Sequence, residues 1–167
     1  IIMNIFYVDK DPFKAAAMLP DKLVVKMPLE SAQMLSTVHR VYNGDAWCDM
    51  VGIYKTAHLN HPCTIWARES VMNYKWLYNH FQALSEEYSK RYEGKRHASW
   101  VKLNEKLAEV PILIPKYKFY PPAQAMPDQY KDPDPVKAYR NYLINEKHYA
   151  QWNRCTPKPT WWVKEVA

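Results

Sequence analysis

The sequence has few glycines and few cysteines, and it lacks long apolar runs. Three glycines in 167 residues are too few for a glycine-rich phosphate loop, which argues against nucleotide-driven chemistry. The three cysteines are widely spaced and contain no CxxC pair, which favours a reducing compartment and argues against a zinc site. No apolar run approaches the ~20 residues of a membrane helix, and the first residues lack the pattern of a secretory signal peptide. We therefore expect a cytoplasmic protein with no membrane partner, metal or other cofactor.

The histidines also lack a motif with chemical meaning. His58 and His61 are three residues apart, but no HExxH sequence, paired carboxylates or paired cysteines accompany them. No cysteine lies in a recognisable nucleophile motif. We interpret these residues as structural.

What the sequence does contain is basic and aromatic residues. The net charge is +6 and 14% of the residues are aromatic. Lys and Arg neutralise phosphates, and aromatic rings stack on bases, so this composition is compatible with nucleic-acid binding, although many basic domains bind no nucleic acid. A hydrophobic content of 48% indicates a folded chain, and the length of 167 residues predicts a single domain over 1–167.

Apolar residues recur at helical spacing, which predicts an all-α fold of three to four helices with long proline-rich connections and an extended aromatic tail. The expected helices are 19–41, 61–92, 99–108 and 136–152, preceded by a short helical turn at 12–18. Residues 3–8 are expected to form a short strand or an extended arm, and 45–60 a loop. The prolines of 111–127 predict an ordered extended connection that buries its Ile112, Ile114, Tyr117, Phe119 and Tyr120.

Glu30 is the main catalytic candidate, because it is a single carboxylate in an otherwise apolar and basic helical segment. Asp21 can cap the start of this helix, and Pro28 should kink it within a turn of Glu30. Burial against Val24, Met34 and the second long helix should raise the pKa of Glu30, whereas the nearby Lys26 and Arg68 should lower it. The alternative is a solvated glutamate paired with Lys26.

Further basic and polar residues are expected near Glu30, and a second group of candidates lies in the tail. The first group comprises Lys22, Lys26, Gln33, His39, Arg40 and Arg68. The tail contains Lys158, Trp161, Trp162 and Lys164. Adjacent tryptophans on an extended backbone point in different directions, so one can pack while the other contacts a partner. Anchoring of both rings to the core is equally compatible with the pattern.

Short motifs spread along the chain are shared with a known family. Leu19, Asp21 and Lys22 fit the pattern L-x-D-[QK], and Glu30 follows nine residues after the aspartate. In these residues the chain resembles the phage pyrimidine-dimer DNA glycosylase/AP lyase family, of the endonuclease V type, whose catalytic glutamate has this position. Three further matches are Asn60-His61-Pro62, Glu146-Lys147 and Lys158-Pro159-Thr160-Trp161-Trp162, which is similar to the family's Arg-Pro-Thr-Trp-Tyr.

The resemblance implies a DNA repair or modification enzyme that removes an altered base from double-stranded DNA. An amine would attack C1′ of the sugar to form an imine, while Glu30 stabilises positive charge and moves protons through ring opening and strand cleavage. The family uses a free N-terminal amine, which here would be that of Met3 or of Ile1, with Lys22 or Lys26 as the alternative nucleophile.

The resemblance also implies which side chains contact DNA. Phosphate contacts are expected from Arg68, Arg140, Lys147, Lys158 and Lys164. Trp161 or Trp162 would wedge into a kinked duplex and allow a base to leave the stack. We expect a monomer, encoded by a phage and acting in the cytoplasm of a bacterial host.

Three residues depart from the family pattern. Leu23 replaces a histidine, and Leu29 and Gln33 replace the arginines on either side of the glutamate. These losses place dimer specificity in question and leave two alternatives. One is a non-catalytic basic DNA- or RNA-binding phage protein on the same scaffold, and the other is an enzyme of nucleotide metabolism.

Overall fold

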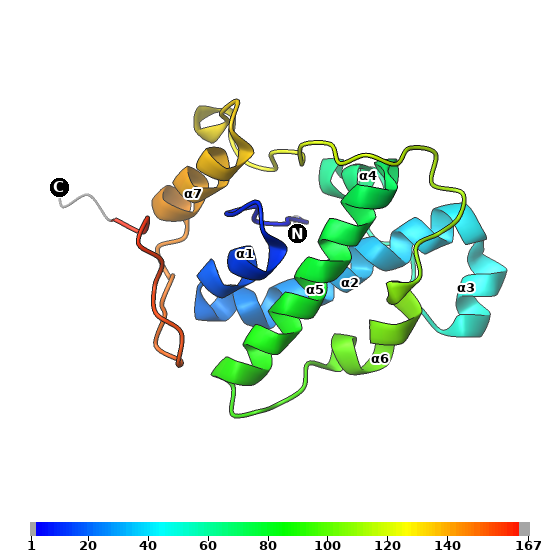
Figure 1. Ribbon diagram of the computed structural model, residues 1–167, viewed down its shortest axis with the longest axis horizontal. Helices are drawn as coiled ribbons and strands as arrows, with labels where there is room; N and C mark the ends of the chain where they lie inside the picture. Colours follow the sequence, from blue (N-terminus) through cyan, green and yellow to red (C-terminus); the bar gives the residue numbers. More distant parts are fainter. Residues whose placement is uncertain (1–2, 164–167) are drawn as a thin grey trace.

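The computed structural model describes residues 3–163, and within this range the fold is all-α, as predicted (Figure 1). It contains more helices than the three or four expected, together with one 3-10 helix. In chain order these are α1 (Pro12–Met18), α2 (Asp21–Asn43), α3 (Asp45–Val51), α4 (Pro62–Glu69), α5 (Val71–Arg91), α6 (Ala98–Ala108), η1 (Asp128–Tyr130) and α7 (Pro135–Glu146). None of the helices in the described range has the length and apolar character needed to cross a bilayer.

The two longest helices, α2 and α5, cross at the centre of the molecule, and α1, α4 and α6 pack around them (Figure 1). Their apolar stripes meet in a core in which Leu35 of α2 and Leu77 and Leu84 of α5 are completely buried. Each such side chain contributes roughly 1.5–3 kcal/mol through its removal from water. The core therefore fixes the orientation of α2 and, with it, of the catalytic candidate.

Residues 3–8 form the extended arm that was one of the two expectations for this segment, and they have no strand partner. Ile5 and Val8 are fully buried, and the ring of Tyr7 packs on Trp76 of α5 at 4.9 Å between centroids. The Asn4 side chain donates a hydrogen bond of 3.0 Å to the carbonyl of Ala125. These contacts fasten the arm between α5 and the proline-rich connection.

The expected helix over 61–92 is wrong in one respect, because the chain breaks it at Ser70. Ser70 is extended, and its hydroxyl accepts a hydrogen bond from the Asn73 amide at the start of α5. The amide of Val71 donates to the carbonyl of Lys116, where the proline-rich connection passes. A cap and a long-range contact thus override the helical periodicity of the sequence.

The expected loop over 45–60 is also wrong in part, because its first half is α3. Gly44 and Gly52 border this helix with φ values of 81° and 88°, which favour glycine. Arg40 of α2 holds α3 in place through ion pairs of 3.1 Å to Asp45 and 2.8 Å to Asp49.

The connection 111–127 is extended, as predicted, but it buries less than expected. Ile114 is buried and Tyr120 is half-buried, whereas Ile112, Tyr117 and Phe119 are exposed.

The last helix is shorter than its expected range of 136–152, since α7 ends at Glu146. Beyond it, the Trp152 indole donates a 3.1 Å hydrogen bond to the carbonyl of Met18, and the carbonyl of Gln151 accepts one of 2.8 Å from the Asp21 amide. These contacts bring the chain back to the start of α2 (Figure 1), and they account for the early end of the helix.

Asp21 was expected to cap α2, but the N-cap position is Pro20. The Asp21 carboxylate is instead 3.2 Å from the guanidinium of Arg91 at the end of α5. Its other oxygen accepts a hydrogen bond of 2.8 Å from the Asn153 amide. Asp21 therefore joins α2, α5 and the C-terminal segment.

Candidate active site

Glu30 lies on α2 directly beneath the N-terminal arm. Its side chain is buried, and Oε1 accepts a hydrogen bond of 3.2 Å from the backbone amide of Asn4. The ammonium of Lys26, four residues earlier on the same helix, is 3.2 Å from Oε2. The pairing with Lys26 that belonged to the alternative interpretation is present, but the glutamate is buried and not solvated. The helix continues through Pro28 to Asn43.

The surroundings of Glu30 favour its protonated form. Burial raises the pKa of the carboxyl, while the charge and hydrogen bond of Lys26 and the amide of Asn4 lower it without cancelling the effect of burial. Lys26 thus acts in the predicted direction. Arg68 is not among the causes of the shift. A carboxyl group with a raised pKa can donate a proton in one step and accept one in the next.

This shift predicts a pH-dependent stability difference between the wild type and a Glu30→Gln variant. The folded protein holds the Glu30 proton more tightly than the unfolded chain, so the stabilisation is present at acidic pH and is lost as pH rises through the folded pKa. The variant should therefore gain melting temperature relative to wild type between pH 4 and pH 8. Thermal unfolding followed by circular dichroism measures this gain. Glu105→Gln on an exposed site of α6 is the control, and a difference that stays constant or falls with pH contradicts the prediction.

A basic and aromatic wall stands beside Glu30. Lys22 lies two helical turns before Glu30, and its ammonium is 5.5 Å from the centre of the Tyr149 ring. In the turn that follows α7, the ammonium of Lys147 is 5.9 Å from the centre of the Phe6 ring and 5.1 Å from that of the Tyr142 ring. The arm, α2 and residues 147–149 therefore bring basic and aromatic side chains together around the Glu30 carboxyl, and we call this group of residues the hollow.

Cys63 is buried close enough to Glu30 to sense its charge, and Tyr139 is buried next to Cys63. Burial raises the pKa of the Cys63 thiol to about 12, with the charge of Glu30 adding to the shift. Burial also raises the pKa of Tyr139, whose hydroxyl accepts a hydrogen bond from the Ala125 amide. Both groups are therefore uncharged at neutral pH and supply a low-dielectric side to the site.

The arm adopts a strained conformation next to Glu30. Phe6 has a φ of 47°, which costs a bulky residue about 1–3 kcal/mol. The Asn4 side-chain oxygen accepts hydrogen bonds from the amides of Ile5 and Phe6, at 2.8 and 2.9 Å, and the Phe6 ring stacks on Tyr142. The side chain of Asn4 thus bends the arm so that its own backbone amide meets Glu30.

The comparison with protein families covers the part of the chain that contains this glutamate. The family model described as pyrimidine dimer DNA glycosylase matches residues 3–100, which include the arm, Glu30 and the helices α1 to α5. The chain belongs to this family. Searches of curated proteins and of solved structures give no significant match.

Three amine candidates of this glycosylase family member, Met3, Lys22 and Lys26, lie on the arm and on α2 near Glu30. Met3 is buried, and its neighbour Asn4 contacts Glu30 directly. Lys26 is in contact with Glu30, and Lys22 is exposed on the same face of α2. Ile1, the other candidate for the N-terminal amine, lies outside the described residues.

Three polar residues expected near Glu30 serve the scaffold instead. His39 is buried and its ring is 2.8 Å from the Tyr74 hydroxyl; burial lowers its pKa to about 4. Arg40 binds α3, and Arg68 donates a hydrogen bond of 2.7 Å to the carbonyl of Leu59. Arg68 lies beside Tyr42, about 18 Å along α2 from Glu30 at 1.5 Å per residue.

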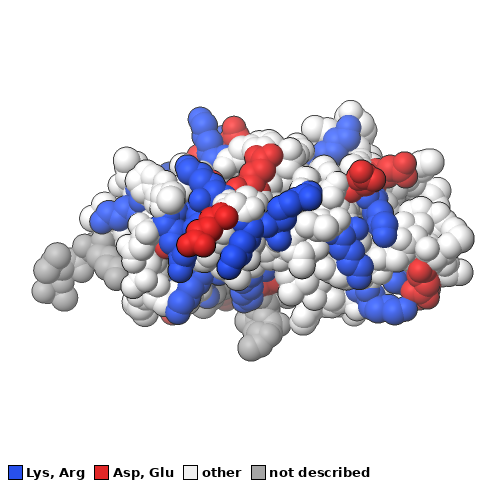
Figure 2. All heavy atoms as spheres, turned by 90° about the horizontal axis from the view of Figure 1, so that it is seen from below, with Lys and Arg blue, Asp and Glu red and all other residues white. Residues whose placement is uncertain are grey.

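The residues expected to contact phosphates differ in how accessible their side chains are. Arg140 donates a hydrogen bond of 2.8 Å to the carbonyl of Val8, and its guanidinium is 3.5 Å from the Asp9 carboxylate. It therefore stabilises the end of the arm. Lys147 is half-buried beside the hollow, whereas Lys158 is fully exposed. Lys164 lies outside the described residues. On the face in Figure 2, basic side chains predominate and acidic ones are scattered, as suits a protein that acts on DNA.

The two tail tryptophans both pack on the protein. Trp162 is buried, with its ring 5.0 Å from that of Trp152. Trp161 is half-buried and donates a hydrogen bond to the sulfur of Met18. The anchoring role is thus observed for both rings, and Trp161 is the more accessible of the two for DNA.

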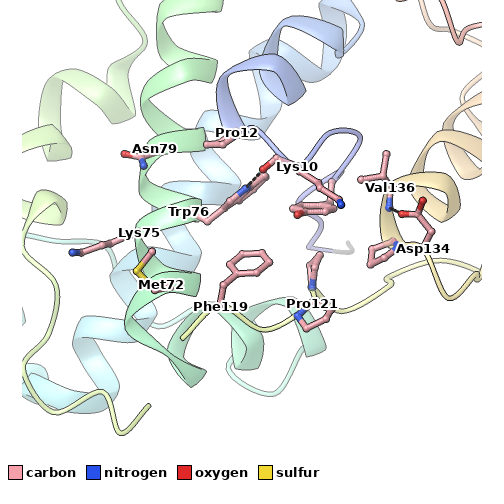
Figure 3. A pocket seen from close by; sticks show the side chains of 13 residues that line it. Lys10, Pro12, Met72, Lys75, Trp76, Asn79, Phe119, Pro121, Asp134 and Val136 are labelled. Carbon is pink, nitrogen blue, oxygen red and sulfur yellow. Dashed lines mark hydrogen bonds between the residues drawn. The ribbon is translucent and has the colours of Figure 1, made fainter. Parts of the chain in front are cut away.

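The structure also contains an apolar cavity of about 600 Å³ between the arm, α5 and the proline-rich connection (Figure 3). Tyr7, Trp76 and Phe119 form much of its wall. The nearest carboxylate, Asp134, is engaged in capping α7 through the Val136 amide. No group of three or more potential metal ligands occurs in the part of the chain that the structure describes. The hollow at Glu30 is therefore the arrangement best suited to acid–base chemistry.

Sequence reasoning identified Glu30 and the two lysines but missed Asn4 and Tyr149. Tyr149 was assigned to the apolar stripe of a helix that in fact ends before it. Asn4 carries a weak signal, since a short amide side chain near an extended segment often bonds its own backbone. Its contact with Glu30 joins residues 26 positions apart and has no sequence signature.

Proposed function

We propose that this protein is a DNA glycosylase with AP-lyase activity that acts on damaged double-stranded DNA as a monomer. The single observation on which this rests is the buried Glu30 carboxyl, with its raised pKa, in contact with the N-terminal arm and Lys26. The family membership supports the same activity. Burial and the low dielectric near Cys63 and Tyr139 strengthen electrostatic interactions at this carboxyl.

The reaction begins with an amine at the hollow. Its lone pair forms a bond to C1′ of the damaged nucleotide, and the base leaves with the electron pair of the glycosidic bond. The attacking nitrogen, which is positively charged after it has bonded to C1′, gives one proton to the departing base. The nitrogen lone pair then forms the C=N bond as the electron pair of the O4′–C1′ bond goes to O4′, and O4′ receives the proton of the Glu30 carboxylic acid. The product is a protonated imine between the protein nitrogen and C1′.

Strand cleavage follows from the same carboxyl group. Glu30 is now a carboxylate and can accept the proton on C2′, which the imine has acidified. The electron pair of that C–H bond forms a C2′–C3′ double bond, and the 3′ phosphate leaves. Lys22, which lies over the Tyr149 ring, and Lys147, which lies over the Phe6 ring, would neutralise phosphates near the reacting sugar.

Reductive trapping tests the proposal and identifies the amine. Borohydride added to the protein with duplex DNA containing one abasic site should link the two covalently, since only an imine is reduced to a stable bond. Mass spectrometry of the digested adduct should find DNA on a peptide that contains Met3, Lys22 or Lys26. Lys22→Ala and Lys26→Ala variants separate the two lysines from the terminal amine.

The second candidate is a non-catalytic DNA-binding protein on the same scaffold. It is favoured by the residues that replace the family's histidine and arginines, since Leu23 is buried and Leu29 is exposed without a charge. Such a protein would bind duplex DNA with strong salt dependence, and it would give no adduct with borohydride. Absence of an adduct at a protein concentration that saturates the DNA therefore contradicts the enzyme and supports the binding protein.

A further inference from the structure

The C-terminal helix α7 contacts the N-terminal arm at two points. At the far end of the arm, Arg140 donates a hydrogen bond of 2.8 Å to the carbonyl of Val8. Nearer to Glu30, the ring of Tyr139 lies edge-on to that of Phe6, with 6.4 Å between the centroids. Phe6 is the residue with the strained φ of 47°, so α7 packs against the bend of the arm.

The hydroxyl of Tyr139 also binds the proline-rich connection where it passes the arm. It donates a hydrogen bond of 2.5 Å to the carbonyl of Ala123 and accepts one of 3.2 Å from the amide of Ala125. The side chain of Tyr139 is completely buried, so its hydroxyl depends on these two protein partners. The two hydrogen bonds therefore fix the position of Ala125.

The carbonyl of Ala125 is the partner of the Asn4 side chain. It accepts a hydrogen bond of 3.0 Å from the side-chain amide of Asn4. The side-chain oxygen of Asn4 accepts hydrogen bonds from the amides of Ile5 and Phe6. The backbone amide of Asn4 in turn donates to Oε1 of Glu30 at 3.2 Å. A path of hydrogen bonds thus leads from α7 through the proline-rich connection and the arm to the catalytic candidate.

We propose that Tyr139 is a positioning residue, whose hydroxyl keeps the N-terminal arm against Glu30 for the reaction. The inference rests on the proposed function, because the arm brings the Asn4 amide and the neighbouring Met3 amine candidate to the carboxyl group. A displacement of about 1 Å at a reacting group can cost about 10²-fold in rate. The family match ends at residue 100, so this support for the arm lies outside it.

Hydrogen exchange measures how firmly the arm is attached. Tyr139→Phe keeps the ring against Phe6 and removes the hydroxyl. Because two hydrogen bonds are lost, the arm should open more often, and exchange at the amides of Ile5 and Phe6 should accelerate by about 10-fold. Tyr42→Phe is the control, since it removes a 2.9 Å hydrogen bond to the carbonyl of Arg68 near the other end of α2 and should leave exchange in the arm unchanged.

Kinetics on the same variant separate positioning from binding. We expect single-turnover cleavage of a duplex with one abasic site to slow by about 10- to 100-fold in Tyr139→Phe. The Kd for this duplex should stay within about twofold of wild type, because a completely buried hydroxyl does not reach DNA. A side chain that only stabilised the fold would lower the melting temperature without slowing cleavage by the folded protein.

A second variant interrupts the path from the arm. Asn4→Ser retains a side-chain oxygen that can accept from the amides of the arm, but serine is too short to donate to the carbonyl of Ala125. It should reproduce the faster exchange and the slower cleavage, and it decides whether this carbonyl positions the arm if Tyr139→Phe fails to fold. The double variant should be no slower than the slower single variant, since both changes break one path. Asn104→Ala, which removes an amide-to-carbonyl hydrogen bond of 2.7 Å on α6, is the control.

Exchange and kinetics distinguish this inference from the proposed function. Wild-type protein that gives neither strand cleavage nor a borohydride adduct contradicts the proposed function, while the exchange data still decide whether Tyr139 holds the arm. Wild-type exchange at Ile5 and Phe6 in folded Tyr139→Phe overturns the inference. It is also overturned if this variant exchanges faster but cleaves at the wild-type rate, or if the losses of the two single variants add in the double variant.

Discussion

Replacing Glu30 with Gln is expected to lower the rate of strand cleavage at an abasic site by about 10²- to 10⁴-fold, the range that general acid–base groups contribute. The amide keeps the shape of the carboxyl group and can still accept the Asn4 hydrogen bond. It can neither donate a proton to O4′ as an acid nor accept the C2′ proton as a base. Single-turnover cleavage of a labelled duplex, with protein in excess, measures the effect on the chemical step.

Binding of the duplex separates catalysis from substrate affinity in this variant. Removal of one negative charge from a basic surface should leave the Kd unchanged or slightly lower, so the loss should appear in the rate and not in affinity. Glu105→Gln on α6 changes the same charge at an exposed site away from the hollow and should cleave at the wild-type rate. A Glu30→Gln protein that cleaves within twofold of wild type would show that the carboxyl plays no part in the reaction.

Replacing Arg91 with Met is expected to destabilise the protein by about 3–5 kcal/mol, because buried carboxylates lose their partner. The Arg91 side chain is fully buried and pairs with Asp21 at 3.2 Å and with Glu87 at 2.9 Å. It also donates hydrogen bonds to the carbonyls of Leu19 and Ala17, at 2.6 and 2.9 Å. Methionine fills similar space but satisfies none of these acceptors.

Urea denaturation measures this loss of stability. In a chain of this size the corresponding fall in melting temperature is about 6–20 °C, from about 2–4 °C per kcal/mol. Arg96→Met removes a charge at an exposed position shortly after α5 and should change the free energy of unfolding by less than about 0.5 kcal/mol. Similar stabilities for the two variants would mean that the buried ion pairs do not support the fold.

The sequence predicted those parts of the fold that depend on local periodicity. The central helix around Glu30 and the helix near 99–108 appear close to the predicted positions, because their apolar stripes repeat at helical spacing and face one core. Ser70 shows where this reasoning fails. No glycine or proline marks the break there, and the partner that stabilises it, at Lys116, is 46 residues away in sequence.

For the candidate site, sequence reasoning likewise placed together only residues that share one helix. Glu30, Lys22 and Lys26 share one helix, so spacing alone places them on one face. The groups that complete the hollow arrive from the two distant ends of the described chain, as the contacts of Asn4 and Tyr149 show. Such contacts follow from tertiary packing, which no short sequence pattern encodes.

The two hydrogen bonds that join Asp21 to Gln151 and Asn153 have a consequence for biosynthesis. The Asp21 carboxylate bonds a residue 132 positions further along the chain, so residues 147–153 cannot dock beside Glu30 until residue 153 has left the ribosome. A nascent chain that already contains the complete family-matched segment would display its glutamate without these residues. Contacts of such high sequence separation form late in folding, and the proposed repair activity would therefore appear only after residue 153 has been synthesised.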